Sequence, residues 1–296
     1  MQNFTEDHTS KNLANILDKL IRMIPGLDLS KTKLTSVNDN AANIVRGIRL
    51  SDTITGQVRC VAHTLQLVLN DCINSEPQVA DIIRKCKAIA SLTHRSSKQA
   101  NKVKMMCERL NNDPSQTQQW NYRVIVSPGG IRWNSTFFCM KSIQKLEEPL
   151  LQLRGSDSDF HDVPTELEFS MIEDILPILD AFNKATDEVS AEITITMQDV
   201  LRLIYNLTKY LENSTTTYQS VHQPVRHWVR NALANMRDRF PNYGTEVREF
   251  AIGHFFNPEF RGLICKITDR DSWDNLLEEF INANAKVNKI SSVNSE

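Results

Sequence analysis

The chain has 296 residues, of which 41% are apolar and 24% are charged, and its formal net charge is −2. This composition is typical of a globular protein with a sizeable core and excludes a chain that is disordered throughout. With so little net charge, the whole-chain field does not attract nucleic acid, and any such binding must use a local patch.

The six cysteines are dispersed without the spacing of a disulfide framework. The sequence shows neither a secretory leader nor an apolar run near 18 residues. We therefore expect a soluble intracellular chain with reduced thiols and no membrane partner.

Helical periodicity dominates the sequence. An amphipathic helix is expected at residues 11–24, before Pro25 and Gly26, and the best strand candidates are residues 33–37 and 58–61. Further helices are expected at 63–73, 78–110, 134–153, 165–185, 196–212, 219–238, 246–254 and 271–284. Thr196 with Asp199 has the spacing of a capping box.

A polar loop at residues 111–130 is the expected organisational boundary. It divides the chain into residues 1–110 and a helical region at residues 131–296. Beyond it, residues 127–140 read SPGGIRWNSTFFCM, in which a Gly-Gly turn leads through Arg132 and Trp133 to the helix-capping types Asn-Ser-Thr. The Trp133 side chain either packs in the hydrophobic core, which we favour, or offers a flat surface to a ligand.

Four other segments accompany this run in a characteristic order: VNDNAANIVRGI at 37–48, VRCVAHTLQLVLND at 58–71, residues 188–211, and FFNPEFRG at 255–262. Together they resemble the hAT superfamily of transposases and the transposase-derived zinc-finger BED domain-containing proteins. The resemblance covers nearly the whole chain. It implies that residues 1–110 form a partial ribonuclease H-like region with a long basic helix, and that residues 131–296 form the family's helical insert-like domain.

The resemblance also implies a catalytic pattern of three acidic residues that hold two divalent cations, about 4 Å apart, for phosphodiester chemistry. Only the second acid has a counterpart, Asp39. Cys107-Glu108-Arg109 imitates the context of the third acid but precedes the insert, so we reject it. We therefore expect a remnant site without enzyme activity or cofactor, where Mg²⁺ would bind only in an intact relative. Asp39 then serves better as the cap of a helix that begins near Ala41.

Cys60 and His63 are zinc-ligand types at the spacing of one end of a zinc finger. No second Cys/His pair follows at finger spacing, so a buried cysteine and a helix-start histidine are the preferred alternative. In the family, the pair matching Arg132 and Trp133 is implicated in stabilising a flipped base. An indole can stack on any base, although packing between sheet and helices is the stronger expectation for Trp133 here.

The helix expected at 78–110 is basic and carries Arg84, Lys85 and Lys87 close together. Such a run could contact several phosphates, but its lack of aromatic residues makes it poor at reading sequence. A solvated outer face is the alternative, and the acidic segments 147–174 and 269–279 could be its partners within the fold.

We expect a mainly α fold: a large helical domain attached to an incomplete ribonuclease H-like α/β unit. In the family's strand order, the strand at 33–37 would lie beside the first strand, which has no counterpart here. Another protein chain could therefore complete the sheet. The leading functional hypothesis is a catalytically inactive, transposase-derived protein that binds DNA or protein in the nucleus, with no small-molecule substrate. The alternatives are a partial chain of an active hAT transposase and a helical protein-interaction scaffold.

Overall fold

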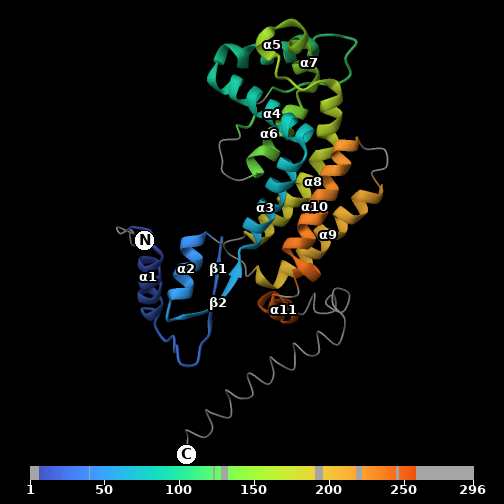
Figure 1. Ribbon diagram of the computed structural model, residues 1–296. Coiled ribbons are helices and arrows are strands. Elements are labelled where there is room, and N and C mark those ends of the chain that lie inside the picture. Colours follow the sequence, from blue (N-terminus) through green and yellow to red (C-terminus); the bar gives the residue numbers. More distant parts are fainter. Residues whose placement is uncertain are drawn as a thin grey trace, which may run out of the picture. The chain divides into compact units, whose positions relative to one another are not determined.

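A computed structural model of the protein describes residues 7–39, 41–122, 124–127, 133–190, 196–217, 222–244 and 247–257. The chain forms two compact units. The first comprises Met1–Thr64, Glu192–Arg202 and Pro241–Glu296, and the second comprises Leu65–Ala191 and Leu203–Phe240. Within the described residues, a two-stranded sheet is the only β structure, so the expected mainly α fold is confirmed (Figure 1).

The first unit contains a short parallel β-α-β arrangement. Strands β1 (Leu34–Asn38) and β2 (Ile54–Arg59) are joined by helix α2 (Ala42–Leu50), which packs against both strands. Burial alternates along the strands because successive side chains point to opposite faces of a sheet. The first strand lies where the sequence predicts it. The second begins four residues earlier than expected, and Val61 already belongs to the next helix.

Helix α1 (Ser10–Arg22) packs alongside α2 at a close approach that requires a glycine. A Cβ atom on Gly47 would lie 3.1 Å from both the Cβ of Leu13 and the carbonyl oxygen of Ser10. The two helices run in the same direction, since Asn43 bonds the carbonyl of His8 and Ser51 bonds Asp18 further along.

The Asp18 carboxylate ties α1 to the turn between α2 and β2. It accepts hydrogen bonds from the hydroxyls of Ser51 (2.5 Å) and Thr53 (2.6 Å) and from the backbone N–H groups of Asp52 and Thr53. Partial burial raises the pKa of Asp18, but these hydrogen bonds outweigh it and hold the pKa below its usual value. The single acidic residue of α1 is thereby used inside the fold.

The second unit is built of helices. Its members are α3 (Val61–Ser75, from Leu65 onward), α4 (Pro77–Arg95), α5 (Ser97–Asn111), α6 (Asn134–Gln144), α7 (Glu147–Ser156), the short 3₁₀ helix η1 (Ser158–Phe160), α8 (Glu166–Val189), α9 (Val200–Thr217, from Leu203 onward) and α10 (Gln223–Arg239). Phe137, Phe160, Phe169, Phe182 and Trp228 are among its fully buried side chains. These large aromatic groups supply much of its core.

The long helix expected at 78–110 is divided into α4 and α5. Ser96 adopts an extended conformation, ends α4 and caps α5, accepting a hydrogen bond from the Gln99 N–H at 3.4 Å. The helix expected at 134–153 is likewise divided, before Glu147. Pro149 accounts for this second break, because a proline ring clashes with the carbonyl four residues earlier, at Lys145.

Two other local expectations need correction. Thr196 makes no capping hydrogen bond and leads instead into a 3₁₀ helix, η2 (Met197–Asp199). The capping box of the described structure is at Thr165 and Glu168, at the start of α8. The compact units also divide the chain differently from the expected boundary at 111–130, since α4 and α5 belong with α6 to α8.

The rest of the first unit contains η3 (Pro241–Gly244) and α11 (Arg248–Phe255), which packs on η2. The helix expected at 271–284 lies outside the described residues. None of the helices in the described part of the chain is long and apolar enough to cross a membrane.

Candidate nucleic-acid interface

Trp133 lies at the start of α6, in the core of the second unit. Its side chain is only 5% exposed, and its ring meets that of Phe182 in α8 edge to face, with centroids 6.4 Å apart. The indole is therefore a packing anchor, and little of its face is open to a base. Arg132 lies outside the described residues.

The Asn-Ser-Thr run does not cap α6, because Trp133 is the N-cap residue and no side chain caps the helix. Asn134 instead donates a hydrogen bond to Asn183 of α8 at 2.8 Å, and Asn183 donates to Asp187 at 2.8 Å. This polar link and the Trp133–Phe182 contact both join the start of α6 to α8. The sequence motif is thus explained by packing between two helices.

The basic side chains of α4 that we nominated for phosphate contact are engaged with acidic residues. Arg84 bonds Asp81 at 2.9 Å and Asp162 at 3.0 Å. Lys85 lies 3.0 Å from Asp81 and 2.5 Å from Glu168. Arg84 and Lys85 stay predictions as nucleic-acid contacts, and a phosphate at either one would have to compete with these carboxylates.

The same arrangement continues along α5, where Lys102 bonds Asp157 and lies 3.5 Å from Asp159. All but one of the acids that meet Arg84, Lys85 and Lys102 lie in the acidic segment 147–174. The expectation that this segment is a partner of the basic helix is confirmed. The sequence predicted the acidic partner segment, but it did not predict which cations would form ion pairs with that segment.

The pKa shifts of Lys85 and Glu168 follow from this pairing. Burial lowers the pKa of Lys85 and raises that of Glu168, but hydrogen bonds and opposite charge move both in the other direction. The net result is a raised pKa for Lys85 and a lowered pKa for Glu168. Both groups are thereby held in their charged forms around neutral pH.

Other cations near α6 remain exposed. Lys87, Arg95 and Lys141 are exposed, and in the described part of the chain no ion pair joins them to an acid. Lys87 lies close enough to α6 to oppose the effect of burial, which raises the pKa of the Cys139 thiol to about 11. The Lys141 ammonium lies 5.3 Å from the ring of Phe137, and Phe138 beside it is 43% exposed.

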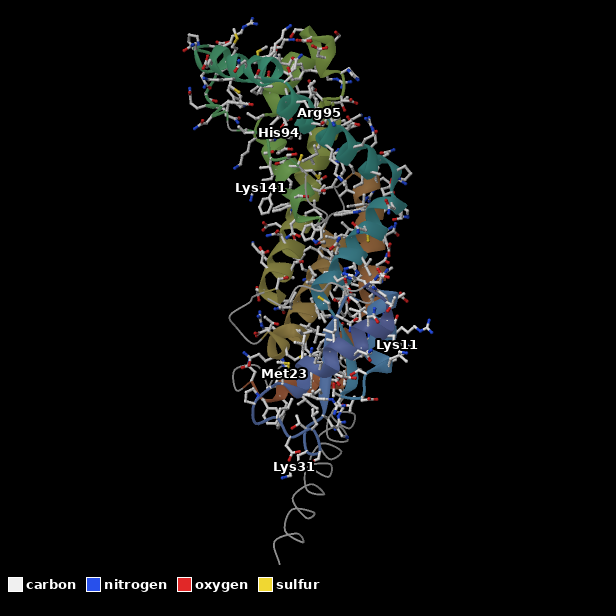
Figure 2. All side chains as sticks on the ribbon, turned by 90° about the vertical axis from the view of Figure 1, so that its left-hand side faces the viewer. Lys11, Met23, Lys31, His94, Arg95 and Lys141 are labelled. Carbon is white, nitrogen blue, oxygen red and sulfur yellow. The ribbon has the colours of Figure 1, made fainter. Side chains whose placement is uncertain are left out.

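We call Lys87, Arg95, Phe138 and Lys141 the α4–α6 face. Figure 2 shows Arg95 and Lys141 on the same side of the second unit. Ile125 and Val126, in the segment that precedes α6, are hydrogen-bonded to both α4 and α6. Nε2 of His94 lies 2.6 Å from the carbonyl oxygen of Ile125, and the N–H of Val126 donates to the Ser142 hydroxyl at 3.1 Å.

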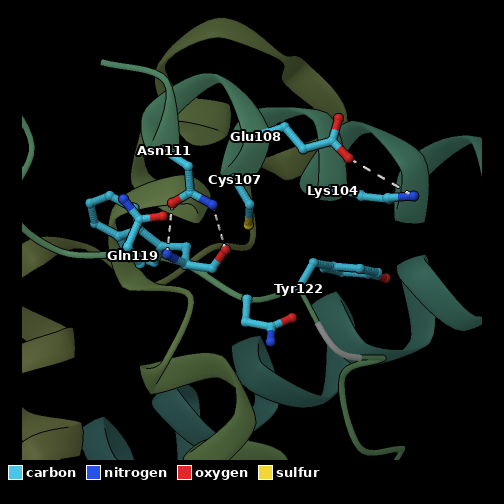
Figure 3. A pocket seen from close by; sticks show the side chains of 8 residues that line it. Lys104, Cys107, Glu108, Asn111, Gln119 and Tyr122 are labelled. Carbon is cyan, nitrogen blue, oxygen red and sulfur yellow. Dashed lines mark hydrogen bonds and ion pairs between the residues drawn. The ribbon is translucent and has the colours of Figure 1, made fainter. Parts of the chain in front are cut away.

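A polar hollow of about 420 Å³ lies at the end of α5 (Figure 3). Asn111 fixes its loop by accepting from the Trp120 N–H at 2.8 Å and donating to the Trp120 carbonyl at 2.9 Å. Tyr122 lines the opposite side, and Lys104 lies 3.9 Å from Glu108 at the rim. The hollow combines an aromatic ring with amides, but its one cation already has a carboxylate partner.

Asp39 is exposed after β1, and its carboxylate accepts a hydrogen bond from the Ala41 N–H at 3.2 Å. The N-cap residue of α2 is Ala41, which has no side-chain cap. Asp39 therefore orders the turn into the helix from a position two residues before the N-cap, and does not occupy the capping position that we expected.

Cys60 is partly exposed, not buried as preferred, and His63 is also partly exposed. Among the described residues, no group of three or more His, Cys, Asp or Glu side chains is placed to hold a metal ion. The geometry of the described chain thus offers these two residues no further ligands.

Comparison with known proteins finds a family match for part of the chain. Residues 58–178 match a family model described as the ZBED1 RNase-like helical domain. The chain is similar to zinc finger BED domain-containing protein 4 of Homo sapiens, with 20% identity over 177 residues that cover 60% of this chain and 14% of that protein. It is also similar to zinc finger BED domain-containing protein 6 of Mus musculus, with 26% identity over 210 residues, 70% of this chain and 20% of that protein.

The chain therefore spans a fifth or less of the length of these two relatives. The matched region begins in β2 and extends through α3 to α7 into α8. Motif order, a mainly helical fold and the family match agree with one another. These findings support a ZBED/hAT-derived protein, in which residues 58–178 match the RNase-like helical domain.

Proposed function

We propose that this chain is a catalytically inactive, transposase-derived protein that binds nucleic acid in the nucleus without cutting it. The single observation that carries the binding is the exposure of the α4–α6 face: Lys87, Arg95 and Lys141 are exposed, and Phe138 is 43% exposed. Cations of this kind contact phosphates, and an exposed ring can stack on a base. The similarity to zinc finger BED domain-containing proteins favours DNA as the polyanion and the nucleus as the compartment.

The absence of cutting is proposed from the acidic residues. A two-metal site needs several carboxylates to fix and neutralise two cations. By the family pattern, only Asp39 of these 296 residues corresponds to one of the three acids, and its carboxylate bonds the Ala41 N–H. We accordingly propose that the activity of this chain requires no resident metal or other cofactor, and that it acts on no small-molecule substrate.

Binding through the α4–α6 face is tested with a fluorescent duplex and anisotropy between 50 and 200 mM salt, a range over which phosphate contacts weaken steeply. The triple variant K87A/R95A/K141A should weaken binding and reduce the salt slope by about 0.9 per lost phosphate contact.

The matched control is K104A/K184A/R237A, which also removes three exposed cations. Each of these already has an acidic partner: Glu108, Asp180 and Glu212, respectively. This control should bind as the unmodified protein does. Equal weakening by both triple variants, or no binding by the unmodified chain, would contradict the proposal.

A second proposed function is association with another protein chain that completes the sheet. The described sheet has two parallel strands, whereas parallel sheets usually have more strands and both faces covered. Val37 of β1 is 54% exposed. Hydrogen exchange of the isolated chain should therefore be fast in residues 7–64, which belong to the first unit, and slow in the helices after Asn134. Equal protection of both regions would refute this.

A further inference from the structure

The polar hollow at the end of α5 is closed by a loop that hydrogen bonds hold in place. The Asn111 side chain bonds both the N–H and the carbonyl of Trp120, and the Trp120 side chain is buried. At the start of the loop, Asp113 accepts bonds from the N–H of Ser115 at 2.9 Å and from its hydroxyl at 2.7 Å. A volume of about 420 Å³ is within the range of about 300–1,000 Å³ that is usual for ligand pockets. The hollow is therefore large enough for a small ligand and is formed before one binds.

The described residues that line this hollow carry no net charge. Burial raises the pKa of the Cys107 thiol to about 11, so the thiol is neutral at physiological pH. Burial and the nearby Cys107 also raise the pKa of the Tyr122 hydroxyl. Lys104 and Glu108 at the rim oppose one another at 3.9 Å. A phosphate would find no unpaired cation among these residues, and the lining favours a neutral ligand.

Two amides and one ring are available to such a ligand. The side chains of Gln119 and Asn121 line the hollow and are exposed, and in the described part of the chain neither has a hydrogen-bond partner. Each amide offers a donor and an acceptor. The ring of Tyr122 is half-buried and lies across the hollow from Asn111, with Cys107 between them (Figure 3). The lining thus combines a flat aromatic face with paired donors and acceptors.

We propose that this hollow binds the adenine base of a nucleoside, either free or in an unpaired stretch of a nucleic-acid strand. An aromatic ring stacks on any base, which accounts for Tyr122. A side-chain amide matches the adjacent donor and acceptor of adenine, at N6 and N7, which accounts for Gln119 and Asn121. Guanine presents two acceptors there and is matched by a cation, but Lys104 already faces Glu108. This site is separate from the α4–α6 face and does not depend on binding there.

The test is a titration of adenosine with the 296-residue protein, in which proton NMR follows the H2 and H8 resonances of the base. Stacking on Tyr122 should shift both resonances upfield. The variant Y122A should weaken binding by about fivefold or more, whereas Y122F, which keeps the ring, should bind as the unmodified protein does. Inosine, which has an acceptor in place of the N6 donor, should bind more weakly than adenosine, and Q119A/N121A should abolish this preference.

Two controls separate this site from its surroundings. N112A/Q118A removes two exposed amides of the same loop that do not line the hollow, and it should leave adenosine binding unchanged. The triple variant of the α4–α6 face should also leave it unchanged, so that failure of one proposal is distinguishable from failure of the other.

A second titration with a short single-stranded oligodeoxyadenylate distinguishes the two sources of the base. Binding of adenosine that depends on Tyr122 assigns the free nucleoside as a sufficient ligand, and such binding by the oligonucleotide alone assigns the strand. The proposal is overturned if neither probe shifts, if Y122A binds both probes as well as N112A/Q118A does, or if the unmodified protein binds inosine as tightly as adenosine.

Discussion

Helices α1 and α4 have the same kind of sequence, with aliphatic residues at helical spacing and cations on the remaining surface, yet they differ in what covers them. Helix α4 buries Val79, Ile82, Ile83, Cys86 and Ile89, and its cations Arg84 and Lys85 bond acids of the second unit. Helix α1 buries Ala14 alone. Periodicity therefore predicts which face of a helix is apolar. Whether another element buries that face depends on the rest of the fold.

The largest expected difference between the two regions is in core packing. Phe182→Ala, at a fully buried position against Trp133, should lower the free energy of unfolding by about 3–5 kcal/mol. Leu20→Ala on α1, where the side chain is 43% exposed, should cost less than about 1 kcal/mol. Urea denaturation of both variants measures the contrast, and equal losses would show that α1 is packed as tightly as the core.

The ion pairs provide the next comparison. A double-mutant cycle on Lys85 and Glu168, whose side chains are each 17% exposed, should give a coupling energy of about 1–2 kcal/mol. The matched cycle on Lys104 and Glu108, both 59% exposed, should give below about 0.5 kcal/mol. A coupling at Lys85–Glu168 no larger than that of the exposed pair would contradict the role assigned to segment 147–174.

The same pair predicts a dependence on pH. Because the pKa of Glu168 is lower in the folded protein than its usual value of about 4.5, its contribution is fully present above that value. The coupling should then disappear as the pH falls through the folded-state pKa of Glu168. Repeating the cycle at descending pH checks this, and a coupling that persists in strong acid would mean that charge is not its source.

A smaller effect is expected at the break between α4 and α5. Ser96→Ala removes the cap of α5 and should cost about 1 kcal/mol. Ser97→Ala, at the first residue of the same helix, is a matched control that should change stability by less than about 0.5 kcal/mol. If the two variants are equally stable in thermal unfolding, the Ser96 hydroxyl does not stabilise the helix start.

The smallest effect is expected in the first unit. Asp18→Asn should cost about 0.5–1 kcal/mol, since an amide oxygen accepts the hydrogen bonds of Ser51 and Thr53 less strongly than a carboxylate. The lowered pKa of Asp18 means that this contribution is lost on acidification below the usual aspartate range. Wild type and variant should therefore converge in stability in acid, and a difference that grows there would contradict the assignment.

The positions of most helices could be predicted from the sequence, but the breaks and contacts could not. Ser96 lies in a polar stripe where helical periodicity continues on both sides, so only the folded backbone reveals its capping role. Pro149 was a usable signal for the division of α6 from α7. The Trp133–Phe182 contact and the Asn134–Asn183 bond join residues 49 positions apart, and such pairs are fixed by tertiary packing.

The candidate site, too, could be predicted only in part, because its ion pairs depend on tertiary packing. Composition identified the basic helix and its acidic partner segment. Once the pairing of Arg84, Lys85 and Lys102 is taken into account, the described cations near α6 that have no acidic partner include Lys87, Arg95 and Lys141. A count of charges along one helix cannot distinguish a bonded lysine from an exposed one. Three-dimensional pairing therefore moved the proposed nucleic-acid surface toward α6.

The proposal that this chain binds nucleic acid without cutting it is tested most directly by incubating the purified 296-residue protein with labelled duplex and Mg²⁺ or Mn²⁺. We predict a salt-sensitive complex and intact DNA strands. Metal-dependent nicking that disappears in Asp39→Ala would contradict this account.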